Sequence, residues 1–424
     1  MAADVLPPEI LAEIFSRLPV QSLLRFRSTS KSLKSLIDSH NFTNLYLKNN
    51  PLNRFIILRH KSDLYQLQVD DDDFSKSMIP LNHPLSTNIM LSLFSLKGNR
   101  TFPLIGSCNG LLALSDGEIV FKHPHGVLET TIWNPNTRKD RTIPFIPLPI
   151  PNIEDSDNPN RGGICVHGFG FDPFTADYKL LRITWLFARQ NIFYDSHVSL
   201  FSLKTNSWKT IPSMPYALQY VQAMGVFVQN SLHWVMAKKL DGSYPWLIVA
   251  FNLTLEIFNE VPLPVELEGE EVNSNSNGSF KIRVAVLGGC LCMSVNYEAT
   301  KIDVWVMKDY GSRDSWCKLF TLVKSCFNSP LDFLRPLCYS SDGGKVLLEA
   351  NPNLDKTLRK LFWYDLKSEQ VSYVEGIPNF DEAMFYVGSL VSPFFPVDTC
   401  KKENRTSKTK RRDDFLSRGF KLKL

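Results

Sequence analysis

The sequence predicts a mainly β protein: a short three-helix unit at the N-terminus, then a kelch-like β-propeller of six blades and a basic C-terminal tail. Three observations lead to this prediction. Aromatic residues are abundant, with 29 Phe, 13 Tyr and 8 Trp in 424 residues, and such residues favour half-buried strands. A strand signature recurs along the chain, and helical periodicity is confined to its first 40 residues.

The N-terminal segment has the periodicity of short amphipathic helices. Leu6, Ile10, Ile14 and Leu18 repeat at four-residue steps and form one apolar stripe of a helix that begins near Pro7. Pro19 ends this run, and two further short apolar segments follow it. Three short helices cannot bury all their apolar faces against one another, so we expect a partner surface.

This segment closely resembles an F-box, because it combines Leu6-Pro7, Leu18-Pro19 and Ser30-Lys31 with a Leu-Arg segment between them. The resemblance implies binding to a Skp-type adaptor and, through it, to the cullin and RING subunits of a ubiquitin ligase. Phe26 and Leu33 stand where the family often has Cys and Trp, and both keep the apolar character. The residues expected to contact the adaptor are Leu6, Pro7, Ile10, Leu11, Ile14, Leu18, Pro19, Leu23 and Leu24.

The rest of the chain repeats a strand signature. A bulky residue ends an apolar run, Asp or Asn usually follows it, and an aliphatic residue stands ten positions later. The bulky residues lie 50 to 68 residues apart, close to the period of kelch propeller blades. We expect them to pack between blades; they are Val69, Trp133, Phe201, Phe251, Trp305 and Tyr364, the copy at Trp305 carrying extra residues.

Gly-containing turns precede several of these runs. Asn109-Gly110 and Gly288-Gly289 supply the positive φ angles that two-residue hairpins require, so four strands fit in each repeat. The region from Phe55 to Pro393 also resembles the F-box-associated interaction domain of plants, which implies a propeller that recruits substrates. The residues that carry this resemblance are 106–111, 133–138, 168–173, 177–179, 206–209 and 230–234.

The C-terminal tail is basic. Residues 398–424 contain ten Lys and Arg against four Asp and Glu, so the preceding chain has a net charge of −2 and is not a basic groove for nucleic acid. The tail resembles that of an F-box protein that represses plant immunity, which implies nucleotide-binding, leucine-rich immune receptors as clients. Lys408, Lys410, Arg411 and Arg412 form a weak nuclear-import signal; a docking segment and a solubilising tail are the alternatives.

Catalytic and metal motifs are incomplete in this sequence. Gly168 and Gly170 lack the third glycine of a dinucleotide fingerprint. Cys290 and Cys292 have no second pair at metal-ligand spacing, and His123 and His125 flank a proline in a predicted loop. We therefore predict no catalytic residue, no metal site and no cofactor. Acidic runs at 70–73, 154–157 and 266–271 are candidate client-binding loops.

The chain has neither a leader-like N-terminus nor an 18-residue apolar stretch, so we expect no signal peptide and no membrane span. Eight cysteines without a secretory signal are expected to stay reduced, which places the protein in the cytoplasm and nucleus. The predicted domains are 1–48 (F-box), 49–398 (propeller) and 399–424 (tail). The predicted function is client recruitment by a ubiquitin ligase; the alternatives are a propeller scaffold outside ubiquitination and a galactose-oxidase-like enzyme.

Overall fold

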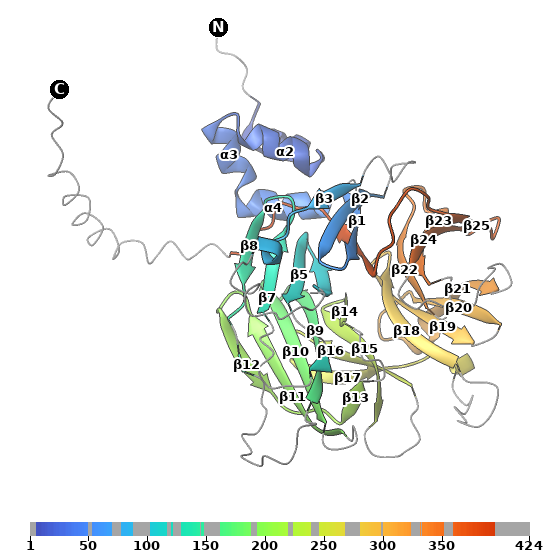
Figure 1. Ribbon diagram of the computed structural model, residues 1–424. Helices are drawn as coiled ribbons and strands as arrows, with labels where there is room; N and C mark the ends of the chain where they lie inside the picture. Colours follow the sequence, from blue (N-terminus) through green and yellow to red (C-terminus); the bar gives the residue numbers. More distant parts are fainter. Residues whose placement is uncertain are drawn as a thin grey trace, which may run out of the picture. The chain divides into compact units, whose positions relative to one another are not determined.

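The computed structural model describes residues 6–49, 53–69, 78–87, 102–116, 120–121, 129–144, 146–147, 162–187, 193–218, 224–238, 246–267, 280–297, 300–323, 331, 333–351 and 359–394. Statements about the structure refer to these residues. Four helices come first and strands follow, arranged in six sheets (Figure 1). The predicted mainly β fold with a helical N-terminus and a six-bladed propeller is confirmed.

The helical unit contains one helix more than the sequence predicts. Its helices are α1 (Pro8–Phe15), α2 (Val20–Arg27), α3 (Lys31–Ile37) and α4 (His40–Asn49). The fourth helix is capped by Ser39, whose Oγ accepts a hydrogen bond from the Phe42 amide at 3.2 Å. Only two of its residues, Phe42 and Tyr46, are buried, and this sparse i, i+4 stripe is why the sequence pattern does not indicate α4.

Each blade is an antiparallel sheet whose strands follow one another from the channel outwards. Blade 1 is β26 (Glu382–Val387), β1 (Arg54–His60), β2 (Asp63–Gln68) and β3 (Ile79–Leu81). Blade 2 is β4 (Leu104–Cys108), β5 (Leu111–Asp116), β7 (Glu129–Asn134) and β8 (Lys139–Thr142). Blade 3 is β9 (Gly162–Asp172), β10 (Asp177–Phe187), β11 (Phe193–Ser202) and β12 (Ser207–Ile211), with β6 (Val120–Phe121) added beside β9.

The remaining blades have the same order. Blade 4 is β14 (Val226–Val228), β15 (Ser231–Lys238), β16 (Leu247–Asn252) and β17 (Ile257–Val261), with β13 (Tyr216–Leu218) on the far end of β15. Blade 5 is β18 (Phe280–Leu287), β19 (Cys290–Tyr297), β20 (Lys301–Met307) and β21 (Trp316–Val323). Blade 6 is β22 (Leu334–Tyr339), β23 (Lys345–Ala350), β24 (Lys360–Asp365) and β25 (Val371–Tyr373).

The two ends of the propeller close the ring together. The last strand, β26, is the innermost strand of blade 1 and pairs with β1 over six residues, from Arg54 opposite Val387 to Arg59 opposite Glu382. In Figure 1 the blue strands of blade 1 therefore lie beside the red strands of blade 6. This pairing joins chain segments more than 300 residues apart and leaves no unpaired edge on β1.

The bulky repeat residues lie within two positions of the end of the third strand of each blade, as the signature predicts. All six side chains are at most 4% exposed. Four of the bulky residues are followed by the same kind of turn. The side chain of the next residue accepts a hydrogen bond from a backbone N–H of the turn. The residue five positions after the bulky one has φ between 55° and 58°. Those fifth residues are Arg138, Asn206, Glu256 and Glu369.

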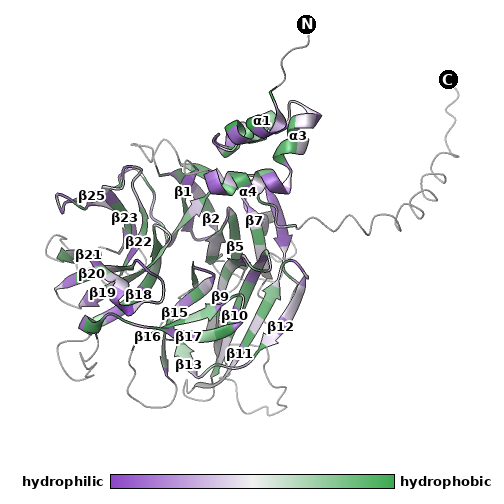
Figure 2. Cartoon of the chain, turned by 180° about the vertical axis from the view of Figure 1, so that it is seen from behind, coloured by the Kyte–Doolittle hydropathy of each residue, from purple (hydrophilic) through white to green (hydrophobic). Residues whose placement is uncertain are grey.

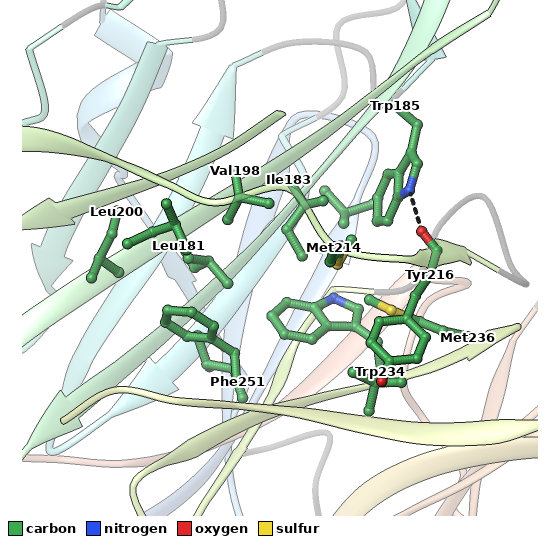
Figure 3. Close-up of a cluster of buried hydrophobic side chains, with 14 of the residues drawn as sticks. Leu181, Ile183, Trp185, Val198, Leu200, Met214, Tyr216, Trp234, Met236 and Phe251 are labelled. Atoms are coloured by element: carbon green, nitrogen blue, oxygen red, sulfur yellow. Dashed lines mark hydrogen bonds between the residues drawn. The ribbon is translucent and has the colours of Figure 1, made fainter. Parts of the chain in front are cut away.

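The inner strands of a blade are buried on both faces, which explains their nearly continuous apolar runs. In β16, Ile248 and Ala250 pack toward blade 5, whereas Val249 and Phe251 pack toward blade 3. Figure 3 shows the layer between blades 3 and 4, where the Trp185 indole donates a hydrogen bond to the Tyr216 carbonyl at 3.2 Å. Figure 2 shows hydrophobic segments along β10 and β11 of blade 3.

Candidate functional site

The helical unit presents an apolar stripe to the surface, which starts at Leu6, just before α1, and continues at Ile10 and Ile14 within that helix. Leu6, Ile10 and Ile14 are 47 to 49% exposed, although each is a large aliphatic side chain. Phe15 and Ala12, on the other side of the helix, pack against the core of the helical unit. The four-residue spacing therefore separates an inner face from an outer face, and the outer face is an uncovered apolar surface in this chain.

The two Leu-Pro pairs start the first two helices. Pro7 and Pro19 are the N-cap residues of α1 and α2, and their carbonyls accept the first helical amides at 3.0 to 3.2 Å. Both prolines are exposed, beside the apolar stripe in sequence. Proline fits here because it lacks the amide that a helix start leaves unpaired.

The other predicted adaptor contacts lie deeper. Leu11, Leu18 and Leu24 are half-buried, and Leu23 is fully buried with Val20, Ile37, Phe42 and Tyr46. In this conformation Leu23 supports the exposed stripe from within the helical core and is not part of the surface. Phe26 is 40% exposed and stacks on Phe15, with ring centroids 5.2 Å apart, so α2 also presents an apolar side chain to solvent.

Asn53 links the helical unit to the propeller. The buried Asn53 side chain accepts a hydrogen bond from the Val20 amide at 3.1 Å and donates one to the Tyr46 hydroxyl at 2.7 Å. Its carbonyl accepts the Gly388 amide at 2.8 Å, just after β26, and Leu390 packs on the helical core. The F-box is therefore attached at the end of blade 1 where the ring closes.

The propeller contains a cavity of about 580 Å³ along its axis. Its walls come from the innermost strands of all six blades, including Gly106 of β4, Phe169 of β9 and Val284 of β18. Most of the wall is apolar, but Arg283, Arg335, Arg359 and Glu382 also line it. These charged residues had no place among the sequence predictions, although a charge inside an otherwise apolar inner strand, such as Arg335 between Leu334 and Pro336, is a signal for them.

One buried carboxylate organises these arginines. Glu349 is fully buried and lies 2.6 Å from nitrogen atoms of both Arg335 and Arg359. It also accepts the Ala383 amide at 3.2 Å, which connects blade 6 to blade 1. Burial alone would raise the pKa of the Glu349 carboxyl, but the charges of Arg335 and Arg359 and their hydrogen bonds outweigh burial and hold the pKa below its ordinary value.

Blade 3 contains a buried cysteine beside a buried histidine. A Cys–His pair can act as a catalytic nucleophile and base, but the pKa values of this pair do not suit that role. Cys165 Sγ lies 3.9 Å from His167 Nε2. Burial raises the pKa of the Cys165 thiol to about 11, and burial together with the charge of Arg182 lowers the pKa of His167 to about 3. Both groups are therefore neutral at neutral pH, and neither supplies the thiolate that nucleophilic catalysis requires.

The glycines and cysteines that the sequence singles out have packing roles. A Cβ on Gly168 would lie 2.9 Å from the Leu232 side chain, and one on Gly170 would lie 2.3 Å from the Phe227 ring, so both allow blades 3 and 4 to approach closely. Cys292 is buried, and burial raises its thiol pKa. Among the described residues, no group of three or more His, Cys, Asp or Glu side chains could hold a metal ion.

Several predicted features lie outside the described residues. They are His123, His125, the acidic runs at 70–73 and 154–157, most of the run at 266–271, and the tail with Lys408, Lys410, Arg411 and Arg412. Within the part of the chain that the structure describes, no helix has the length and apolarity needed to cross a membrane. The cysteines described there are free thiols.

Comparison with known proteins gives two family matches. Residues 4–45 match the F-box domain, and residues 54–392 match the F-box associated beta propeller domain. The chain is 33% identical to F-box protein CPR1 of Arabidopsis thaliana, over 99% of both chains. It is 29% identical to F-box protein At4g22390, over 99% of both, and 26% identical to F-box/kelch-repeat protein At3g23880, over 92% of this chain and 96% of the relative, both from the same plant.

Proposed function

This chain belongs to the F-box proteins with an F-box associated β-propeller, and we propose that it is the substrate-recognition subunit of an SCF-type cullin-RING ubiquitin ligase. The observation that carries this proposal is the half-exposed stripe of Leu6, just before α1, and Ile10 and Ile14 on α1, whose other face is packed. A Skp-type adaptor covers the stripe and removes its apolar surface from water, which drives association. Through the adaptor the chain joins the cullin and RING subunits.

The proposed mechanism is proximity. One chain binds the adaptor with its F-box and a client with its propeller, so client lysines reach a high effective concentration near the ubiquitin-charged enzyme. No side chain of this protein performs the transfer of ubiquitin in this mechanism. The hydrogen bonds of Asn53 support it, because they hold the F-box against the ring closure of the propeller.

Adaptor binding tests the proposal. The triple variant Leu6→Ala, Ile10→Ala, Ile14→Ala removes only exposed side chains, and we expect it to bind a purified Skp-type adaptor at least about 30-fold less tightly, since hot-spot truncations cost about 2 kcal/mol or more. Ser35→Ala, at an exposed polar position of α3, is the matched control and should bind normally. Equal adaptor affinity of wild type and the triple variant would count against the ligase role. Stoichiometric copper in the purified protein would instead favour the oxidase-like alternative.

We also propose nucleotide-binding, leucine-rich immune receptors as clients, with negative regulation of plant defence as the outcome. The resemblance of the tail and the 33% identity to CPR1 over the full length support this choice. Inducing the protein in plant cells should shorten the half-life of such receptors, and inducing the triple F-box variant should not. Unchanged receptor half-lives in the presence of an assembled ligase complex would eliminate this client class.

For the location of the protein we propose the cytoplasm and the nucleus. The basic cluster of Lys408, Lys410, Arg411 and Arg412 supports nuclear import. Replacing these four residues with Ala in a fluorescent fusion should lower the nuclear fraction. An unchanged nuclear fraction would leave the tail as a docking or solubilising segment.

A further inference from the structure

A short segment after the last strand contacts both the F-box and the turns of blade 2. This strap, residues 388–391, starts directly after β26. Gly388 donates its amide to the Asn53 carbonyl at 2.8 Å, and the Leu390 side chain packs on the helical core. Among the described residues, Leu390 is the one propeller residue whose apolar side chain joins that core. Whatever holds the strap in place therefore also holds the F-box.

Ser389 of the strap is fully buried, and its side chain and main chain are both bonded to blade 2. Its Oγ donates to the Asn109 carbonyl at 2.6 Å, and its amide donates to Asn136 Oδ1 at 3.2 Å. Its carbonyl accepts a hydrogen bond from Asn134 Nδ2 at 3.1 Å, and the same Nδ2 donates to the Val391 carbonyl at 2.7 Å. Because buried polar groups are costly to leave unpaired, these bonds fix the strap in one register on blade 2.

The glycine of the blade 2 hairpin makes room for the strap. Gly110 has a φ of 78°, and a Cβ there would lie 2.8 Å from the Ser389 amide nitrogen and still closer to its side chain. Gly289 occupies the same hairpin position in blade 5 and has a φ of 80°, but such a Cβ would meet no described atom within 4 Å. The positive φ favours glycine at both positions, whereas the close approach of the strap adds a second requirement at Gly110.

The turn after β7 holds the strap with the side chain that also shapes the turn. Asn134 Oδ1 accepts the amides of Asn136 and Thr137 at 2.9 and 3.2 Å. Asn252 in blade 4 and Asp365 in blade 6 accept the corresponding amides of their own turns. The acceptor is therefore part of the blade repeat, and a carboxylate can supply it. The Nδ2 group of Asn134 has the additional task of binding the strap.

We propose that the turns of blade 2 form a clasp that fixes the orientation of the F-box relative to the propeller, with Asn134 and Ser389 as its positioning residues. The consequence rests on the proposed function: a client on the propeller is held at a constant separation from the ubiquitin-charged enzyme. A loose connection would spread client lysines over a larger volume and lower their effective concentration. Neither residue belongs to the stripe of Leu6, Ile10 and Ile14, so orientation and adaptor affinity are separable.

Two clasp variants, each with a matched control, test this inference. Asn134→Asp keeps the acceptor of the turn, but its carboxylate faces the strap carbonyls and repels them. Asn252→Asp makes the same change in blade 4, where the described hydrogen bonds of the side chain are those of the turn. Gly110→Ala pushes Ser389 away, whereas Gly289→Ala places the same strained φ in an open hairpin.

The first measurement is the separation of the F-box and the propeller in the full chain. Spin labels on non-natural amino acids replace Ser35 of α3 and Ser368 of the turn after β24, both exposed, and pulsed electron resonance gives the distance distribution. Wild type and both controls should give one narrow distribution. The clasp variants should give one at least about twice as wide, because a free connection of a few residues spans about 5–6 Å times the square root of its length. Ser389→Ala, which removes one hydroxyl, is the milder variant if the others fail to fold.

The second measurement uses a ligase reconstituted with a purified Skp-type adaptor, cullin, RING subunit and conjugating enzyme. Mass spectrometry of the lysines modified on this chain should show more sites in the clasp variants than in wild type, at unchanged adaptor affinity. Narrow distributions in folded clasp variants, or equal widening in the controls, would overturn the inference. An unchanged set of modified lysines despite a wide distribution would overturn its consequence for ubiquitination. A clasp-dependent distribution in a wild-type chain that binds no adaptor would count against the proposed function alone.

Discussion

The buried carboxylate of Glu349 provides the sharpest test of how blades 6 and 1 are held together around the cavity. In the variant Glu349→Gln the amide oxygen can still accept from Arg359 and from the Ala383 backbone. The amide NH₂ group then faces the guanidinium of Arg335, which is a donor as well. Two half-buried arginines lose the counter-charge of the fully buried Glu349, and breaking a buried ion pair costs about 3–5 kcal/mol.

This cost converts to a measurable shift in the melting temperature. The unfolding entropy is about 2.1 cal/mol/K per residue near 60 °C. The compact unit Met1–Pro393 therefore loses roughly 4–6 °C if it unfolds cooperatively. Differential scanning calorimetry at pH 7 would measure the shift. The control is Glu13→Gln, which removes an exposed ion pair with Arg17 and should change stability by at most about 1 kcal/mol.

The difference in stability between wild type and Glu349→Gln should change with pH in one direction. The pKa of Glu349 in the folded protein is below its ordinary value of 4.5, so the carboxylate contributes its full stabilisation above that value. The contribution disappears as the pH falls through the lower folded pKa, because wild type is then protonated too. The gap between wild type and Glu349→Gln should therefore be constant near neutrality and close in acid. A variant that melts within 1 °C of wild type at pH 7 would refute the role given to Glu349.

The remaining predictions concern blade packing, thiol reactivity and helix capping. Gly170→Ala forces the Phe227 ring to move and should destabilise the propeller by about 1–3 kcal/mol in urea unfolding. Gly344→Ala should be neutral, because the atoms nearest to its Cβ would belong to the Asp342 side chain, at 3.4 Å or more. Alkylation of the native protein at pH 8, measured by mass spectrometry, should label the half-buried Cys290 and Cys317 well before Cys165 and Cys292. Burial raises the thiol pKa values of Cys165 and Cys292 and so keeps them protonated. Labelling of all four at one rate would contradict this. Ser30→Ala removes the cap that accepts the Leu33 amide and should cost about 1 kcal/mol in thermal unfolding, whereas an unchanged midpoint would show that the cap is dispensable.

The propeller could be predicted because its repeat signal is local. One pair of adjacent strands and the turn between them contain the whole signature: the bulky residue, the polar residue after it and the aliphatic residue ten positions later. The spacing in the sequence therefore reflects the register in which the two strands pair. In blade 5 that link is broken: Trp305 pairs with Lys318, whereas Phe251 in blade 4 pairs with Phe258. The extra residues form a 3-10 turn at Arg313–Ser315, consistent with the extra residues noticed in the sequence.

The grouping of charged residues in the cavity wall could not be predicted, because they meet only after the blades are arranged in a ring. Arg283 and Phe333 are 50 positions apart and come from different blades. The burial of Leu23 could not be predicted from the sequence either, although its neighbours are close in the chain. The apolar residues of an F-box occupy two faces, and only the packing of α3 and α4 shows that Leu23 belongs to the inner one. Periodicity identifies an apolar stripe but not what covers it.

The position of Asn53 makes the F-box dependent on the completion of the propeller. Its carbonyl accepts the Gly388 amide, and Gly388 is reached only when β26 has paired with β1. Contacts between residues so far apart in sequence form late, because the chain between them must first be ordered. A chain in which β26 has not paired with β1 therefore lacks both the hydrogen bond to Asn53 and the packing of Leu390 on the helical core. Such a chain still exposes the stripe of Leu6, Ile10 and Ile14 but does not hold it in a fixed position relative to the propeller, so the placement of the stripe requires a closed ring.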